Sequence, residues 1–253
     1  MGTKPHISMT QFAKLHGPLI SLRLGTQLLV VGSSPEAAAE ILRTHDRLLS
    51  ARYILKIMFA GGVDLNRVSL MWAPQCNERW KVLRSLCKAE LFSPKAIESQ
   101  TLLREMKMVE MVEFLGSREG QVVKVKQVVS ATAFNVLANL VFSKDLTRFE
   151  DGECDGSNNG LKGILERLTD LGTRPNLADF FPILGNLDIH GIYKHSLVYL
   201  KQAYAEWEDL IKDRRRARGQ DASSKRRDFL DAMIENEFAD DQINHLIIVS
   251  LIT

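Results

Sequence analysis

The chain has 253 residues, of which 45% are hydrophobic and 25% charged, with 33 basic side chains against 31 acidic ones. This composition is that of a globular protein and excludes a disordered, collagen-like or disulfide-scaffold chain. A net charge of +2 lacks the basic excess of a dedicated nucleic-acid binder, so no nucleic acid is expected as a partner. No signal pattern and no run of about 18 to 20 apolar residues is found, which predicts a cytoplasmic chain or one in peripheral contact with a membrane.

The first part of the chain predicts a small β element followed by helices. Alternating apolar residues on both sides of Gly25-Thr26-Gln27 predict a β-hairpin over 18–31. Ser34-Pro35 is typical of a helix start, with a capping serine and a proline at the first helical position, and predicts a helix over Glu36–Thr44. Ser93-Pro94 repeats this signal, and apolar residues spaced by three and four predict one helix that runs to about Leu115.

The second part predicts mainly long helices. Alternation over Gln121–Val129 is typical of a short strand. The segment Val128–Phe142 is apolar on nearly every face, which at this length predicts a buried helix and not a membrane span. One face of a long amphipathic helix is marked by Leu197, Leu200, Tyr204, Trp207 and Ile211. The sequence therefore predicts a single, mostly α domain with a small N-terminal β element.

Residues typical of metal sites do not form a convincing ligand set. Cys76, Cys87 and Cys154 lack Cys-x-x-Cys spacing and are expected to be reduced thiols. The loop that begins at Asp151 resembles a calcium loop, but its twelfth position is Lys162, where a bidentate glutamate is needed. His190 and His195 are five residues apart, on different helix faces, and are expected at the surface. We expect no metal bound directly by the side chains of this sequence.

The strongest charge feature is a basic patch over 212–227. Its members are Lys212, Arg214, Arg215, Arg216, Arg218, Lys225, Arg226 and Arg227. This patch could contact anionic membranes or nucleic acid, which would suit a catalytically dead helical binding protein. The other interpretation is a solvated loop between helices, which Gly219, Ser223 and Ser224 favour.

Trp80 and Arg84 form the most informative pair. On a helix they lie one turn apart and point the same way. An indole N–H beside a guanidinium can bind a carboxylate, because the first donates a neutral hydrogen bond and the second a charge-assisted one. The plain alternative is a half-buried tryptophan beside an exposed arginine.

Several segments in collinear order resemble one family over essentially the whole chain. They are Thr3-Lys-Pro-His, Leu15-His-Gly-Pro-Leu19, Ser34-Pro35, Thr44-His-Asp-Arg-Leu-Leu-Ser-Ala-Arg52, Trp80-Lys-Val-Leu-Arg84, Leu91-Phe-Ser, Asn176-Leu-Ala-Asp-Phe-Phe-Pro182 and Asp188-Ile-His-Gly-Ile192. Together they resemble the N-terminal half of a plant cytochrome P-450, a haem-thiolate monooxygenase, and are most similar to the geraniol hydroxylase-like group. The resemblance implies the N-terminal portion of the P-450 fold, with Trp80 and Arg84 hydrogen-bonded to a haem propionate.

The resemblance also implies a substrate pocket, lined by the loop from Tyr53 to Trp72 and roofed by Gly172–Phe181. The apolar candidates in these two stretches are Ile57, Met58, Phe59, Leu177, Phe180 and Phe181. They suit a pocket wall and a plain core equally well. By the same resemblance, the cofactor is haem, and the substrate is a small lipophilic molecule of the monoterpenoid type. Electrons come from NADPH through a cytochrome reductase, at the cytosolic face of the endoplasmic reticulum.

The family motifs that carry the chemistry are not found in this sequence. They are an oxygen-activating Ala-Gly-x-Asp-Thr helix, a Glu-x-x-Arg pair on the proximal side and a thiolate loop, so no catalytic residue is assigned and enzyme status stays open. Within the helix predicted to carry Trp80 and Arg84, Lys81 and Ser85 differ from the residues that the family commonly has at these two positions. The apolar run over Ile243–Thr253 resembles the start of the oxygen-activating helix, and Met1 falls just after the family's membrane anchor. We therefore expect residues 1–253 to form a single incomplete domain that alone binds haem weakly or not at all and oxidises nothing.

Overall fold

The computed structural model describes residues 4–60, 62–149, 160–184, 187–217 and 228–252. In chain order, its elements are α1 (Pro5–His16), β1 (Leu19–Leu24), β2 (Gln27–Gly32), α2 (Pro35–Ala39), the π-helix η1 (Glu40–Thr44), α3 (Asp46–Leu49), the 3-10 helix η2 (Lys56–Phe59), α4 (Leu65–Val68), α5 (Glu78–Glu90), α6 (Pro94–Ser99), α7 (Thr101–Ser117), α8 (Val125–Phe142), α9 (Leu161–Thr173), α10 (Leu177–Phe180), the 3-10 helix η4 (Pro182–Leu184), α11 (Ile192–Ala217), α12 (Phe229–Glu235) and α13 (Asp240–Ile252). The prediction of a mostly α fold with a small N-terminal β element is confirmed.

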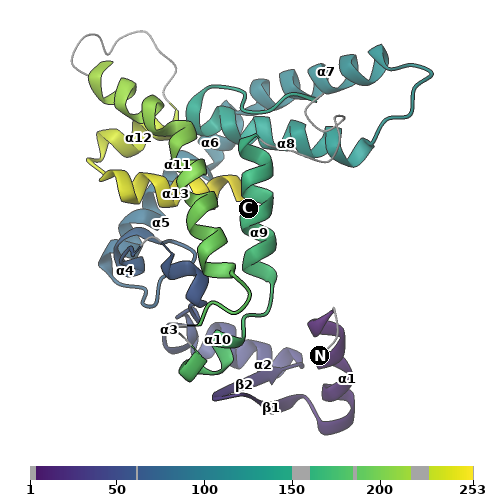
Figure 1. Ribbon diagram of the computed structural model, residues 1–253, viewed down its shortest axis with the longest axis vertical. Helices are drawn as coiled ribbons and strands as arrows, with labels where there is room; N and C mark the ends of the chain where they lie inside the picture. Colours follow the sequence, from purple (N-terminus) through teal and green to yellow (C-terminus); the bar gives the residue numbers. More distant parts are fainter. Residues whose placement is uncertain (1–3, 61, 150–159, 185–186, 218–227, 253) are drawn as a thin grey trace.

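The elements form an elongated molecule (Figure 1). The hairpin lies with α1 and α2 at one end, and α7 and α8 extend together at the other. Between the ends, α9 and α11 pack side by side and α13 crosses near them. The helix α1 was not among the predicted elements. It begins with Pro5 in its first turn and exposes apolar side chains such as Leu15, so it shows no apolar face that a periodicity argument would find.

The β-hairpin is confirmed, with strands displaced by one residue from the predicted range. The strands β1 and β2 pair antiparallel, with Leu19 opposite Gly32 and Leu24 opposite Gln27. The turn between them has Gly25 at φ +60°, a left-handed conformation that glycine adopts without steric cost. Thr26 donates from its backbone N–H to the Phe180 carbonyl at 2.9 Å. The hairpin tip is therefore docked against α10, which follows about 150 residues later in the chain.

Both predicted serine–proline helix starts are confirmed, but the helices that follow are interrupted. Ser34 accepts a hydrogen bond from the Ala37 N–H, and Ser93 accepts one from the Ala96 N–H. The first helix continues as the π-helix η1, so the predicted range is covered by two helical types. The single helix expected from Ser93 to about Leu115 is wrong. The first helix ends at Ser99, and α7 starts after a break at Gln100.

The strand predicted over Gln121–Val129 is wrong, because α8 already begins at Val125. The alternating valines of this stretch meet no neighbouring strand within the described chain, and Val122 is fully exposed. The helix α8 is long and apolar enough to cross a membrane by length and composition alone. Its buried side chains include Phe134 and Asn135, which contact other parts of the protein, so α8 serves as a core helix as predicted.

The core lies where α5, α8, α9, α11, α12 and α13 meet. Its most buried apolar residues include Leu83, Phe134, Val141, Leu165, Trp207, Leu230, Met233, Ile243, Leu246 and Ile247. The predicted amphipathic face of α11 is confirmed, since Trp207 and Ile211 are buried in this core. The Trp207 indole N–H donates to the Asn244 side-chain oxygen at 2.7 Å, which ties α11 to α13. Burial of apolar surface is the main stabilising term for such a helical assembly.

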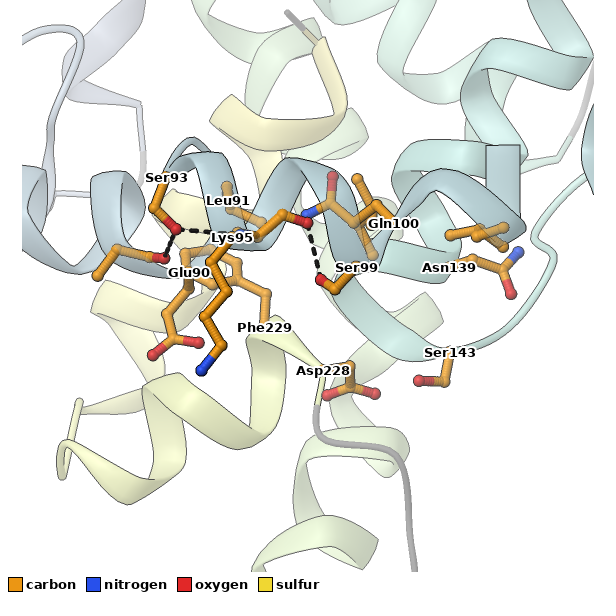
Figure 2. Close-up of a pocket in the computed structure, with 14 residues that line it drawn as sticks. Glu90, Leu91, Ser93, Lys95, Ser99, Gln100, Asn139, Ser143, Asp228 and Phe229 are labelled. Carbon is orange, nitrogen blue, oxygen red and sulfur yellow. Dashed lines mark hydrogen bonds between the residues drawn. The ribbon is translucent and has the colours of Figure 1, made fainter. Parts of the chain in front are cut away.

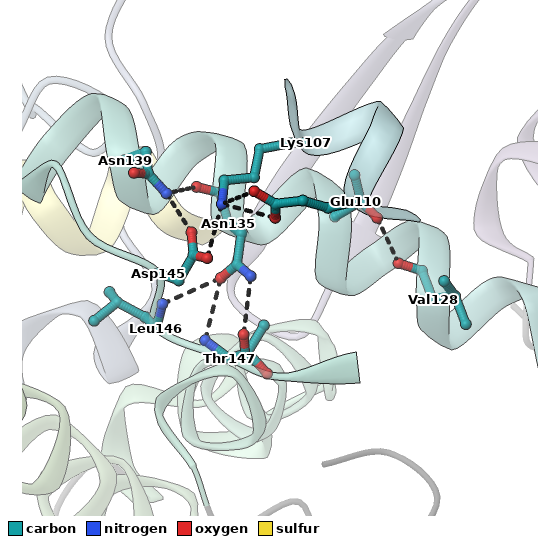
Figure 3. Close-up of polar contacts among 9 residues, drawn as sticks. Lys107, Glu110, Val128, Asn135, Asn139, Asp145, Leu146 and Thr147 are labelled. Atoms are coloured by element: carbon teal, nitrogen blue, oxygen red, sulfur yellow. Dashed lines mark hydrogen bonds and ion pairs between the residues drawn. The ribbon is translucent and has the colours of Figure 1, made fainter. Parts of the chain in front are cut away.

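A buried lysine joins α7 to the end of α8 (Figure 3). Lys107 donates to both carboxylate oxygens of Glu110, at 3.0 and 2.9 Å, and to Asp145 at 2.8 Å. Asn139 also donates to Asp145, at 2.5 Å. Asn135 accepts from the backbone N–H groups of Leu146 and Thr147, both at 3.1 Å. These contacts fix the loop that follows α8 against the α7–α8 pair.

Candidate functional site

The pair Trp80 and Arg84 lies on α5, whose position is set by its buried face. Asn77 caps this helix by accepting from the Trp80 backbone N–H at 2.9 Å. Leu83 and Cys87 are buried in the core and hold the helix against it. Arg84 directly follows Leu83 and is exposed. The helix thus presents a guanidinium to its surroundings from a rigid element.

The structure confirms that Trp80 and Arg84 share a face. The guanidinium carbon of Arg84 lies 5.3 Å from the centroid of the Trp80 ring. This distance is within the range of a cation–π interaction, which contributes about 0.5–1 kcal/mol at exposed sites. The ring therefore limits the directions that the Arg84 guanidinium can take.

The donors of the pair differ in their availability to an anion. The Trp80 indole N–H already donates to the Leu70 carbonyl at 2.9 Å. Among the residues that the structure describes, no acidic side chain pairs with Arg84. A haem propionate therefore fits the guanidinium of Arg84, whereas the indole N–H has a partner within the chain. The assignment of both residues to a propionate stays a prediction.

The two segments predicted to line a substrate pocket are brought together by a residue that the sequence analysis missed. Asp179 in α10 is buried, and its carboxylate accepts from the Lys56 backbone N–H at 2.8 Å. The Tyr53 hydroxyl donates to the Asp179 backbone carbonyl at 3.0 Å. These bonds hold η2 against α10. The aspartate in the stretch Asn176-Leu-Ala-Asp179 was the signal in the sequence that could have indicated this junction. A carboxylate that is buried needs hydrogen-bond partners from other segments.

A cavity of about 510 Å³ lies beside this junction. Its walls are made by Lys56, Phe59, Asn176, Ala178, Leu187, Asp188 and Tyr193. Of the six predicted pocket residues, Phe59 lines this cavity. Ile57 and Met58 belong to η2, Leu177 and Phe180 to α10, and Phe181 follows directly, but none of these five is among the residues that line the cavity. Whether they meet substrate stays a prediction.

A second cavity, of about 460 Å³, lies where the end of α5 meets α6, α8 and α12. Figure 2 shows Glu90 and Lys95 extending toward one part of it, whereas Asp228 and Ser143 lie at another. Ser93 and Ser99 point their hydroxyls at backbone carbonyls of the same turn, so these groups serve the local helix. Of these residues, Ser93 was predicted from the sequence as a helix cap, and the others carried no predicted role.

The described part of the basic patch is neutralised by neighbouring acids. Arg214 pairs with Asp231 at 2.7 Å and with Asp228 at 2.9 Å. Arg215 pairs with Asp240 at 2.7 Å. The remaining members of α11, Lys212 and Arg216, contact acids of their own helix. Arg218 and Lys225–Arg227 lie outside the described residues. For the described arginines, these pairs oppose the interpretation as a surface for anionic membranes or nucleic acid.

Two buried titratable groups, Cys87 and His245, line neither of the two cavities described above. Burial raises the pKa of the Cys87 thiol to about 11. Burial lowers the pKa of His245 to about 4. Within the described ranges, no group of three or more His, Cys, Asp or Glu side chains is placed to hold a metal ion. The loop that begins at Asp151 falls outside those ranges.

Comparison with known proteins shows the family to which the chain is related. The cytochrome P450 family model matches residues 1–252. A probable (S)-N-methylcoclaurine 3'-hydroxylase isozyme 2 from Coptis japonica is 43% identical over 98% of this chain and 49% of its own length. An (S)-N-methylcoclaurine 3'-hydroxylase isozyme 1 from Eschscholzia californica is 39% identical over 98% of this chain and 50% of its own length. The chain thus spans about half the length of these relatives.

A solved structure shows the same fold. A zebra fish cytochrome P450 with progesterone matches with a TM-score of 0.68 and 21% identity, covering 99% of this chain and 55% of its own. The resemblance to plant members of the family is confirmed, but membership of the geraniol hydroxylase-like group is not. Members of the family are haem proteins, and the chain corresponds to the N-terminal half of the full-length relatives. The chain belongs to the cytochrome P450 family.

Proposed function

We propose that this chain forms the N-terminal half of a plant haem-dependent monooxygenase that hydroxylates a small lipophilic substrate. The observation that carries the proposal is the family match over residues 1–252. The haem, when bound by the whole protein, supplies the insertion of one oxygen atom from O2. Electrons are proposed to come from NADPH through a cytochrome reductase, at the cytosolic face of the endoplasmic reticulum.

The residues of this chain contribute binding and shape. Arg84 would hold a propionate, because its guanidinium has the charge and the fork of donors that a carboxylate accepts. The cavity at the junction of η2 and α10 would form part of the substrate wall, with Phe59 as an apolar surface. Asp179 and Tyr53 keep that wall in place through the hydrogen bonds that join the two segments.

The proposed substrate class is an alkaloid like the one named for the relatives. Two relatives with about 40% identity are (S)-N-methylcoclaurine hydroxylases by name, which favours this class over the monoterpenoid expected from the sequence. The test is product formation from (S)-N-methylcoclaurine and from geraniol by the chimera described next. Turnover of geraniol alone would contradict the alkaloid proposal and leave the monooxygenase proposal intact.

The chimera tests the function itself. Residues 1–252 of this chain are joined to the C-terminal half of the Coptis japonica relative, which the chain does not match. We expect the reduced chimera treated with carbon monoxide to show the absorbance of a thiolate-ligated haem. The intact relative is the positive control, and the isolated chain is expected to show no such absorbance. A folded chimera without thiolate-ligated haem would contradict the proposal.

A further inference from the structure

The 3-10 helix η2 begins with a backbone N–H that its own segment does not satisfy. The residue before it, Leu55, has no side-chain oxygen that could cap the turn. The carboxylate of Asp179, 123 residues after Lys56, accepts from the Lys56 N–H at 2.8 Å. Asp179 is only 5% exposed, so its carboxylate depends on such protein donors in place of water. Asp179 therefore caps η2 from a distant segment.

The last carbonyls of α10 are satisfied at the same junction by other segments. Helix α10 ends at Phe180, so these carbonyls have no partner within the helix. The Asp179 carbonyl accepts from the Tyr53 hydroxyl at 3.0 Å and also from the Gln27 side-chain amide. The Phe180 carbonyl accepts from the backbone N–H and the hydroxyl of Thr26, at 2.9 and 3.0 Å. Two consecutive residues of α10 thus join the hairpin tip to the segment that carries η2.

Apolar packing contributes little to the contact between η2 and α10. None of the four residues of η2 is buried, and η2 packs on α11. In α10, the buried residues are Ala178 and Asp179 itself. At the hairpin tip, Thr26 is exposed and Gln27 is half-buried. The position of η2 relative to α10 therefore depends on hydrogen bonds, and the Asp179 carboxylate makes the direct one.

The cavity of about 510 Å³ lies between the two elements that Asp179 joins. The helix η2 contributes Lys56 and Phe59 to its walls, whereas α10 and its N-cap residue contribute Ala178 and Asn176. Asp179 is not among the lining residues. It acts on the cavity through its neighbour Ala178 on one wall and through Lys56 on the other.

We propose that Asp179 is a positioning residue that sets the separation of η2 from α10, and with it the shape of the cavity between them. The carboxylate does so by capping η2 across the junction. The claim that this cavity receives substrate rests on the proposed function. The claim that Asp179 holds η2 does not.

The test is amide hydrogen exchange on the 253-residue chain without haem, measured at the Lys56 amide. Asp179→Leu removes the acceptor and keeps a side chain of similar length. We expect the Lys56 amide to exchange about ten- to hundredfold faster, the range for loss of a hydrogen bond to a charged group. Asp179→Asn keeps an oxygen acceptor, so its rate should stay within about threefold of wild type. Asp64→Leu is the matched control, because the Asp64 carboxylate accepts from the Asn66 N–H within its own turn.

The outcomes of this experiment are distinct. The proposal is overturned if the Lys56 amide exchanges no faster in Asp179→Leu than in Asp64→Leu. It is also overturned if Asp179→Asn exchanges as fast as Asp179→Leu. A second readout needs no variant that must fold. In the wild-type chain the Lys56 amide should exchange slowly and the Ile57 amide rapidly, since the described residues supply no acceptor for the Ile57 N–H. Equal rates at the two amides would overturn the proposal.

Kinetics of the chimera test the claim about the cavity. With the substrate that the chimera turns over, (S)-N-methylcoclaurine or geraniol, Asp179→Leu should raise KM about tenfold and leave kcat within about twofold. Asp179→Asn should restore KM, and haem content should be the same in both variants. An unchanged KM, or a loss of kcat in its place, would overturn the claim about the cavity. A chimera that takes up no haem contradicts the proposed function, whereas the exchange measurements still decide whether Asp179 holds η2.

Discussion

Replacing Lys107 by methionine should destabilise the fold. Lys107 has a side chain only 7% exposed and makes three hydrogen bonds to two carboxylates. Methionine keeps the length and the apolar contacts of the lysine stem but removes the charge. Burial lowers the pKa of Lys107, but the hydrogen bonds to Asp145 and Glu110 outweigh it, so its pKa is raised and the ammonium stays charged.

The size of the effect follows from the exposure of the two carboxylates. Breaking a fully buried ion pair costs about 3–5 kcal/mol, because the remaining charge has no partner. Here Glu110 is 38% exposed and Asp145 is 42% exposed, so water can hydrate both after the substitution. We therefore expect a loss of about 2 kcal/mol in the free energy of unfolding, and a decrease of about 4–8 °C in Tm for a chain of this size.

Urea denaturation followed by circular dichroism measures this loss. Lys212→Met is the matched control, since Lys212 pairs with Glu208 at 2.7 Å while both side chains are more than half exposed. Such surface pairs contribute little, so no measurable change is expected. The raised pKa of Lys107 also predicts that its contribution is present at neutral pH and is lost only as the pH rises above about 10.4. If Lys107→Met unfolds at the same urea concentration as Lys212→Met, the reasoning is refuted.

Three further predictions follow from the packing. Gly25→Ala should loosen the hairpin from α10, because a Cβ there meets the Phe180 carbonyl and φ is positive, and faster exchange of the Thr26 amide would show it. The folded chain binds no proton at His245 until about pH 4, so the free energy of unfolding should fall by about 3 kcal/mol as the pH drops from 6.5 to 4. If the free energy of unfolding depends on pH in the same way in His245→Phe, this prediction is contradicted. Iodoacetamide should label half-exposed Cys76 in the native chain and buried Cys87 only after unfolding, as peptide mass mapping would reveal.

Local signals in the sequence predicted much of the fold because their causes are local. The serine–proline helix starts depend on hydrogen bonds within three residues, as with Ser34 and Ala37. The apolar face of α11 is confirmed because one stripe of side chains faces the core. The strand over Gln121–Val129 failed for the opposite reason. A strand needs a neighbour, and no alternation within one segment can supply it.

The site was only partly predictable for a similar reason. The spacing of Trp80 and Arg84 fixes their shared face, and the structure confirms this. The partner of the Trp80 N–H is a backbone carbonyl on another segment. Every residue has such a carbonyl, so the residue types cannot indicate which one accepts this hydrogen bond. The acids that neutralise Arg214 are the N-cap residue and a first-turn residue of α12, beyond a stretch outside the described residues. Tertiary pairing thus changed the interpretation of both features.

The most direct test of the central claim is haem retention by the chimera and its variants. We predict that Arg84→Gln loses most of its haem on gel filtration, because a propionate loses its charged partner. We predict that Lys88→Gln, which removes an exposed charge one turn further along α5, keeps its haem. Equal haem content in Arg84→Gln and Lys88→Gln would contradict the assignment of Arg84, and a chimera that takes up no haem would contradict the account as a whole.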